Sequence, residues 1–182
     1  MRRIVNSTYV SLDGAIENPQ DWPSGRHEDD GRGLDIQTEL LSSCDAVLMG
    51  RRTYEGFAPV WSARSGDPYS DRINAIEEWV VSTTLSDPKW NNTVVIDADV
   101  VDEIRARKER PGGDIVQYGF GELSYTLLEH GLIDELRLWV HPFLVGHATP
   151  NDLLFRRSSG AMFELADTIP LTSGIVVLTY RA

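Results

Sequence analysis

The residues best suited to chemistry are Gly50, Arg51, Arg52 and Thr53, which directly follow the apolar run Ala46–Met49. A short apolar run that ends in glycine and continues with threonine is typical of a buried strand turning into a helix. Such a junction presents unpaired backbone N–H groups and the positive end of a helix dipole, which suits an anion. Two adjacent arginines add fixed positive charge and paired donors for a phosphate. The alternative is a solvated, basic helix start without a ligand.

A second candidate anion site is the glycine-rich stretch Gly119–Leu123, which follows the apolar run Ile115–Tyr118. Glycines at positions 119 and 121 permit positive φ angles and let the backbone approach a phosphate closely. The alternative is a plain tight turn. Each of these two strand-to-helix junctions could therefore bind an anion such as a phosphate.

The composition narrows the classes of partner. The chain has 182 residues and a formal net charge of −11, which fits one domain at 1–182 and disfavours nucleic acid and anionic membranes as partners. No apolar run approaches the roughly 20 residues of a membrane span, and no signal peptide is expected. The single cysteine, Cys44, is expected to be a buried small hydrophobe in a cytoplasmic protein. The four histidines show no metal-ligand spacing, so no metal is predicted.

Strand and helix signals alternate along the chain, which predicts an α/β fold with a largely parallel central sheet. The expected strands are 3–11, 46–49, 78–82, 93–96, 114–118 and 135–141, followed by two antiparallel strands at 163–169 and 174–180. The expected helices are 34–43, one from residue 53, 100–108 and 121–130, with a short helical turn at 71–77. The apolar run Ile175–Leu178 predicts burial on both faces of the last strand. The long loop Asn18–Gly33 is typical of a functional lid.

Further motifs, taken in order with Gly50–Thr53, carry a resemblance to a known family. They are Ser11–Ile16, Trp79–Leu85, Ile115–Leu123, Leu132–Leu138 and His141–Gly146. The set resembles the dihydrofolate-reductase-like superfamily, and is most similar to the reductase domain of the bacterial riboflavin-pathway deaminase-reductase and its stand-alone relatives. The similarity runs from about Arg3 to Arg181. It implies one dihydrofolate-reductase-like domain, with a mostly parallel sheet flanked by helices and antiparallel C-terminal strands. No zinc-deaminase pattern accompanies it.

The resemblance also implies an NADPH-dependent reductase that transfers a hydride to a small heterocyclic or carbonyl-type substrate. Within Gly50–Thr53, it places Arg51 at the 2′-phosphate that separates NADPH from NADH, and Thr53 at the pyrophosphate. Two other stretches complete the implied cofactor site, namely Ser82 and Thr83 at the adenosine ribose phosphate, and Gly119, Phe120, Gly121, Glu122 and Leu123 under the pyrophosphate. Phe120 replaces a glycine that is frequent in the family. Glu122 occupies a position that is commonly basic in dihydrofolate reductases, so the preference for NADPH rests mainly on Arg51.

The catalytic and substrate-binding assignments come from the same resemblance. Asp13 is a candidate proton donor, with capping of its own turn as the alternative. Ile16 would pack against nicotinamide, and Phe57 would contact the substrate. Trp22 lies in the loop that closes over the substrate in dihydrofolate reductases, with a packing anchor as the alternative. Asp35 is a candidate substrate carboxylate, and Asp29, Asp30 and Glu39 are nearby alternatives at an acidic helix start.

Two other functions stay open beside the reductase. One is a non-catalytic nucleotide- or ligand-binding protein on the same fold, and the other is a reductase that uses a different cofactor, such as a deazaflavin. A shared fold does not determine function. The riboflavin-type relatives pair through the C-terminal end of the sheet, so a homodimer is expected.

Overall fold

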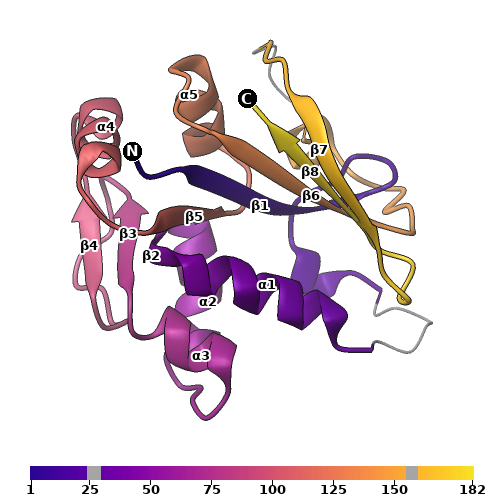
Figure 1. Ribbon diagram of the computed structural model, residues 1–182, viewed down its shortest axis with the longest axis horizontal. Coiled ribbons are helices and arrows are strands. Elements are labelled where there is room, and N and C mark those ends of the chain that lie inside the picture. Colours follow the sequence, from indigo (N-terminus) through magenta and orange to yellow (C-terminus); the bar gives the residue numbers. More distant parts are fainter. Residues whose placement is uncertain (24–29, 155–159) are drawn as a thin grey trace. The chain divides into compact units, whose positions relative to one another are not determined.

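The computed structural model describes residues 1–23, 30–154 and 160–182 (Figure 1). The chain divides into two compact units: unit 1 comprises Met1–Val5 and Leu34–Tyr118, and unit 2 comprises Asn6–Gly33 and Gly119–Ala182. The strands form an eight-stranded sheet in the order β4-β3-β2-β5-β1-β6-β8-β7. The predicted α/β fold is confirmed, while a single domain at 1–182 stays a prediction.

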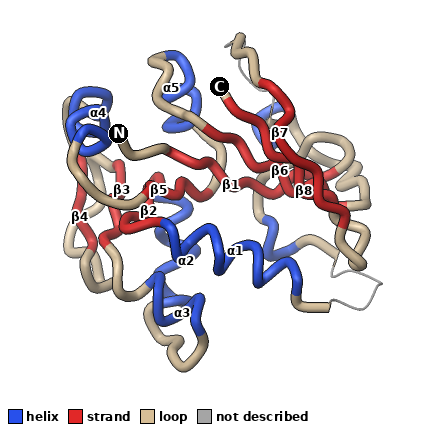
Figure 2. Tube along the Cα trace, viewed as in Figure 1, coloured by secondary structure: helices blue, strands red, loops and turns tan. Residues whose placement is uncertain are grey.

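Unit 1 is built on parallel strands. Its strands are β2 (Cys44–Gly50), β3 (Glu77–Val81), β4 (Thr93–Ile96) and β5 (Asp114–Tyr118), and β2 pairs in parallel with both β3 and β5, as β3 does with β4. Its helices are α1 (Arg32–Ser43), α2 (Arg51–Trp61), α3 (Pro68–Ile73) and α4 (Val100–Glu109), of which α1 begins at the end of unit 2's first segment. Figure 2 shows these strands in red and the helices in blue.

The two faces of β3 explain how helices cover unit 1. Neighbouring residues of a strand point to opposite faces. Val80 packs in a hydrophobic cluster with Leu41 of α1 and Tyr54 of α2. Trp79 instead carries the guanidinium of Arg107, from α4, 4.9 Å from its ring centroid. Accordingly, α1, α2 and α3 lie on one side of these strands and α4 on the other (Figure 1).

Unit 2 combines most of β1 (Ile4–Ser11) with α5 (Glu122–Glu129) and an antiparallel group of strands. That group is β6 (Glu135–His141), β8 (Val176–Arg181) and β7 (Glu164–Pro170), in which β8 pairs with both of its neighbours. Two short 3-10 helices, η1 (Pro19–Asp21) and η2 (Pro150–Asp152), lie in its loops. The core of the unit joins α5, β1 and β6 through Tyr125, Val10 and Leu136.

Most expected helix and strand bounds agree with the structure within two residues, and α2, expected from residue 53, begins at Arg51. Two local expectations differ further. The helical turn expected at 71–77 is the helix Pro68–Ile73, because the Asp67 carboxylate caps its start by accepting the Ser70 N–H at 2.9 Å. In the single chain the last strand is buried on one face, and burial of its other face in a homodimer stays a prediction. Val177 and Thr179 are buried, whereas the alternate residues of β8 stay half-buried.

Cys44 is buried, as expected, and its thiol donates to the Leu40 carbonyl oxygen at 3.2 Å. Across the described ranges, no helix has both the length and the apolar character that crossing a membrane requires.

Candidate functional site

The junction between β2 and α2 leaves the start of the helix open. Gly50 ends β2 and is the N-cap of α2, and no side chain caps the backbone N–H groups that follow it. A Cβ atom built on Gly50 would meet no heavy atom within 4 Å. The first N–H groups of a helix have no partner inside it and carry partial positive charge. This junction therefore has the donors and the space that a phosphate needs.

Arg51 is held beside this open helix start by two hydrogen bonds. Its Nε donates to Glu55 Oε1 at 2.7 Å, and its Nη1 donates to Thr84 Oγ1 at 2.6 Å. Arg52 is exposed on the next position, and the half-buried Thr53 has a hydroxyl with no partner among the described residues. The structure thus places the Arg51 guanidinium beside the uncapped helix start, and Arg52 and Thr53 are the next two residues of the helix. Thr84 was not foreseen, since only Ser82 and Thr83 match the family motif.

Ser82 acts on this site through the turn that follows β3. Its Oγ accepts the backbone N–H groups of Thr84 at 3.2 Å and Leu85 at 2.9 Å. These bonds fix the position of Thr84, which in turn accepts from Arg51. Thr83 is exposed. The ribose-phosphate contact predicted for Ser82 and Thr83 stays a prediction, and the structure adds Thr84 as the residue of this turn that contacts Arg51.

The glycine-rich turn of unit 2 is organised by two polar side chains. Gly119 has a φ of 77°, in the region that glycine tolerates best. Its carbonyl oxygen accepts from Asn6 Nδ2 at 2.9 Å, and Ser124 Oγ accepts the Gly121 N–H at 3.3 Å. Glu122 is exposed on the first turn of α5. The Gly121 N–H is thus already bonded to Ser124. The next backbone N–H groups, of Glu122 and Leu123, belong to the first turn of α5.

Ile16 and Phe120 are both committed to the core of unit 2. Ile16 is 8% exposed and Phe120 is 9% exposed, and both belong to the cluster that contains Val10 and Leu136. The Phe120 ring meets the Tyr125 ring edge-on, with centroids 5.3 Å apart. The cofactor contacts predicted for Ile16 and Phe120 stay predictions.

The Asp13 carboxylate holds two loops together. It accepts from the Ser11 hydroxyl at 2.5 Å and from the backbone N–H groups of Val145 at 3.1 Å and Gly146 at 2.8 Å. Donation by Ser11, and then by the two N–H groups, lowers the pKa of Asp13 from 3.8 to about 2. The group is therefore ionised at neutral pH and holds no proton to donate. The observed role of Asp13 is to link its turn to the distant loop at Val145 and Gly146, which differs from both the cap of its own turn and the proton donor.

Asp35 and Phe57 occupy different surroundings in unit 1. Asp35 is exposed in the first turn of α1, and its carboxylate has no partner among the described residues. Phe57 is half-buried against the core of unit 1, with its ring centroid 5.3 Å from that of Tyr118. The substrate roles of both stay predictions. Of the acidic alternatives, Asp29 lies outside the described residues, as does the central part of the expected lid, 24–29.

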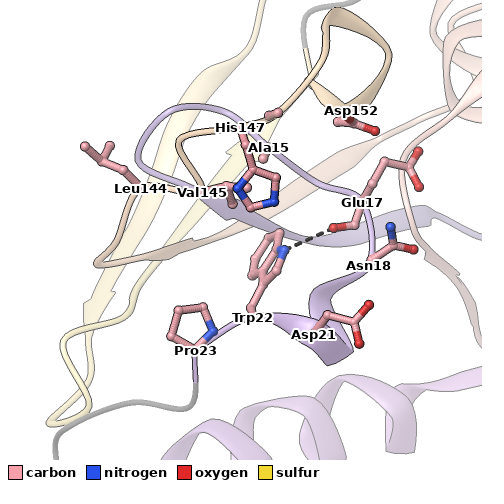
Figure 3. Close-up of a pocket in the computed structure, with 11 residues that line it drawn as sticks. Ala15, Glu17, Asn18, Asp21, Trp22, Pro23, Leu144, Val145, His147 and Asp152 are labelled. Carbon is pink, nitrogen blue, oxygen red and sulfur yellow. Dashed lines mark hydrogen bonds between the residues drawn. The ribbon is translucent and has the colours of Figure 1, made fainter.

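Trp22 is both a packing anchor and the wall of a cavity. Its indole Nε1 donates to the Glu17 carbonyl oxygen at 3.0 Å, and its ring packs edge-on against His141 and Phe143. Trp22 lines a cavity of about 470 Å³ within unit 2. Figure 3 shows its indole ring beside His147. The cavity is also lined by Ala15, Glu17, Asn18, Asp21, Pro23, Leu144, Val145, Ala148 and Asp152.

His141 was not foreseen as a residue of interest. Its Nε2 is buried with no partner among the described residues, and burial lowers its pKa from 6.5 to about 4. The ring lies 4.9 Å from Tyr9 and 5.3 Å from Trp22, measured between centroids. His141 is therefore a neutral imidazole in an aromatic cluster. In the part of the chain described, no group of three or more His, Cys, Asp or Glu side chains is arranged to hold a metal ion.

Comparison with known proteins decides the family. A model described as the RibD C-terminal domain matches residues 2–177. The chain belongs to this family. Members of the RibD C-terminal domain family are reductase-like, which indicates an oxidoreductase of the riboflavin-pathway type. Two relatives of this RibD-type chain are uncharacterized proteins of Bacillus subtilis (strain 168). YyaP is 27% identical over 99% of this chain and 95% of its own length, and YwjB is 28% identical over 82% of each.

Solved structures share the fold. A putative riboflavin biosynthesis protein from Shewanella sp. PV-4 has a TM-score of 0.67 at 22% identity, and covers 100% of this chain and 98% of its own. A pyrimidine reductase-like protein from Corynebacterium diphtheriae has a TM-score of 0.68 at 14% identity, covering 99% and 91%. Acinetobacter baumannii RibD has a TM-score of 0.71 at 18% identity, but only 58% of that longer chain is covered. The fold of the RibD reductase domain is thus confirmed.

Proposed function

We propose that this RibD C-terminal domain protein is an NADPH-dependent reductase that transfers a hydride to a small heterocyclic or carbonyl-type substrate. The observation that carries the proposal is Arg51, held by Thr84 beside the uncapped start of α2. A fixed guanidinium next to open helix N–H groups suits a phosphate ester. The resemblance of one solved neighbour to pyrimidine reductases supports the heterocyclic class of substrate.

The residues of unit 1 fit the phosphate of such a cofactor. Arg51 and Arg52 would neutralise the 2′-phosphate, and the Thr53 hydroxyl and the first N–H groups of α2 would donate to phosphate oxygens. When bound, NADPH supplies the hydride. In unit 2, the turn at Gly119–Leu123 stays the predicted pyrophosphate contact, with the exposed Glu122 as an unfavourable charge.

The proton that accompanies a hydride would come from water or from a carboxyl group other than Asp13. Asp13 is ionised at neutral pH because three hydrogen bonds hold its pKa at about 2. Asp35 is exposed at the start of α1 and is the remaining predicted carboxylate. Asp13 is engaged by Val145 and Gly146 and Asp35 is exposed, so neither is a positioned proton donor, which favours a second candidate function, a nucleotide-binding protein without reductase activity.

Titration of the protein with NADPH and with NADH, followed by nicotinamide fluorescence, tests the proposal. Arg51→Ala should weaken the binding of NADPH by about 1.5–3 kcal/mol, the scale of a charge-assisted hydrogen bond. It should weaken the binding of NADH much less. Arg105→Ala is the matched control, because Arg105 is a partly exposed arginine of α4 paired with Asp102. Equal losses of NADPH and NADH affinity in Arg51→Ala would remove Arg51 from the 2′-phosphate role.

Three outcomes separate the candidate functions. Oxidation of bound NADPH in the presence of pyrimidine or related heterocyclic carbonyl compounds supports the reductase. Tight NADPH binding with no oxidation across such a panel supports the nucleotide-binding protein, and reduction that depends only on a reduced deazaflavin identifies the other cofactor. The homodimer and a cytoplasmic location are proposed with the reductase, by analogy with the riboflavin-type relatives.

A further inference from the structure

The Arg51 guanidinium is restrained from two sides, by a carboxylate and by a hydroxyl. Glu55 follows Arg51 by one helical turn on α2, and its Oε1 accepts from Nε at 2.7 Å. Thr84 lies 33 residues further along the chain, and its Oγ1 accepts from Nη1 at 2.6 Å. Both partners belong to unit 1, as does Arg51. The plane of the guanidinium is therefore set by residues of two different segments rather than left to rotate in solvent.

This arrangement leaves donors for a ligand. A guanidinium has five N–H groups in a rigid fork, and a carboxylate or phosphate accepts two of them in parallel. Glu55 and Thr84 occupy one N–H each, on Nε and Nη1. Both hydrogens of Nη2 and the second of Nη1 have no partner among the described residues. The end of the fork formed by Nη1 and Nη2 can thus receive two oxygens of a phosphate while both existing bonds stay in place.

The Glu55 carboxylate also lowers the net positive charge at the start of α2. Arg51 and Arg52 contribute two positive charges at the start of α2. Glu55 contributes one negative charge, and its carboxylate contacts the Arg51 guanidinium directly. A 2′-phosphate carries up to two negative charges, so it is repelled by Glu55 while it is attracted by the arginines. A 2′-hydroxyl carries no charge and does not experience this repulsion.

We propose that Glu55 is a specificity-determining residue, which orients Arg51 for a 2′-phosphate and by its charge limits the preference for NADPH over NADH. This inference rests on the proposed function, because it assigns Glu55 to the phosphate site of the same cofactor. The Glu55 and Arg51 side chains are 50% and 45% exposed. Their pairing is therefore weak as a source of stability, so a change at Glu55 can alter binding without unfolding the protein.

Two substitutions separate the orienting role from the charge. Glu55→Gln keeps an oxygen that accepts from Arg51 Nε and removes the charge, so NADPH should bind about threefold to fivefold more tightly, with NADH unchanged within about twofold. Glu55→Ala removes the acceptor as well. Glu55→Ala should therefore raise the affinity for NADPH less than Glu55→Gln does, because Arg51 loses one of its two restraints. Asp102→Asn is the matched control, since Asp102 is an exposed carboxylate of α4 whose neutralisation changes the net charge equally.

The experiment measures NADPH and NADH dissociation constants by nicotinamide fluorescence at two ionic strengths. The gain in Glu55→Gln should shrink at high salt, because exposed charges are screened over about 8–10 Å. An NADPH-to-NADH preference that stays at the wild-type value in Glu55→Gln, or rises equally in Asp102→Asn, overturns the inference and leaves the proposed function intact. Failure of the wild-type protein to bind either nucleotide overturns both.

Discussion

Glu78→Gln is expected to flatten the dependence of stability on pH, because Glu78 of β3 carries a buried carboxyl group. The residue is 0% exposed. Its Oε1 has no partner among the described residues, and its Oε2 accepts a long hydrogen bond of 3.4 Å from the Thr93 hydroxyl. Burial raises the pKa of Glu78 from 4.5 to about 9. The carboxyl group is thus neutral in the folded protein at pH 7 and ionised in the unfolded chain.

The magnitude follows from the extra proton that the folded state holds. Between pH 4.5 and about 9, the folded protein binds this proton and the unfolded chain does not. The free energy of unfolding therefore falls by about 1.4 kcal/mol for each pH unit of rise. The stabilising contribution is fully present below pH 4.5 and is lost as pH rises through the folded pKa. From about pH 5.5 to 8.5 the wild-type protein should lose about 4 kcal/mol from this group, and the glutamine variant none.

Urea unfolding followed by circular dichroism, at several pH values between about 5.5 and 8.5, measures this difference. The stability of Glu78→Gln relative to wild type should increase with pH by about 4 kcal/mol over that range. Glu109→Gln is the same change at an exposed residue of α4, and its free energy of unfolding should depend on pH as that of the wild type does. If Glu78→Gln also runs parallel to wild type, the buried carboxyl group is not neutral and the reasoning is refuted.

Three other predictions concern unit 2 and the assembly. Asp13→Asn should speed amide hydrogen exchange at Val145 and Gly146 by about tenfold or more, since their N–H groups lose a charged acceptor. Unchanged exchange would contradict the role of the Asp13 carboxylate in holding these two N–H groups. The His141 imidazole, with a pKa lowered to about 4, should show no NMR titration between about pH 5 and 8, whereas a midpoint near 6.5 would contradict its burial. Light scattering should give about 41 kDa, twice the chain mass of 20.4 kDa, and a monomer alone would exclude the dimer.

Local sequence signals predicted most of the fold. β4, β5 and β6 begin and end at the predicted residues, because each run is bounded by turn or helix signals within a few positions. The short helix α3 was displaced in the prediction because its start depends on Asp67 and Pro68, a capping residue followed by a proline at the first helical position. This capping signal is therefore present in the sequence itself.

The candidate site was less predictable, since its contacts join residues that are distant in the chain. Arg51 and Thr84 are 33 residues apart, and Asp13 reaches N–H groups 132 and 133 residues away. Hydrophobic periodicity carries no information on such pairs. Glu78 was equally hidden, because Glu77 and Glu78 are identical in type and only the pleat of β3 decides which of them is exposed.

The order of segments along the chain has a consequence for synthesis on the ribosome. Unit 1 has all of its residues once Tyr118 has emerged, but the first segment of unit 2, Asn6–Gly33, has to wait for residues 119–182. At roughly 5–20 residues per second, that delay lasts on the order of several seconds. During it, Val10 and Ile16 lack the Tyr125 and Leu136 side chains that later cover them. Until translation ends, the nascent chain thus exposes an apolar N-terminal segment that chaperones can bind.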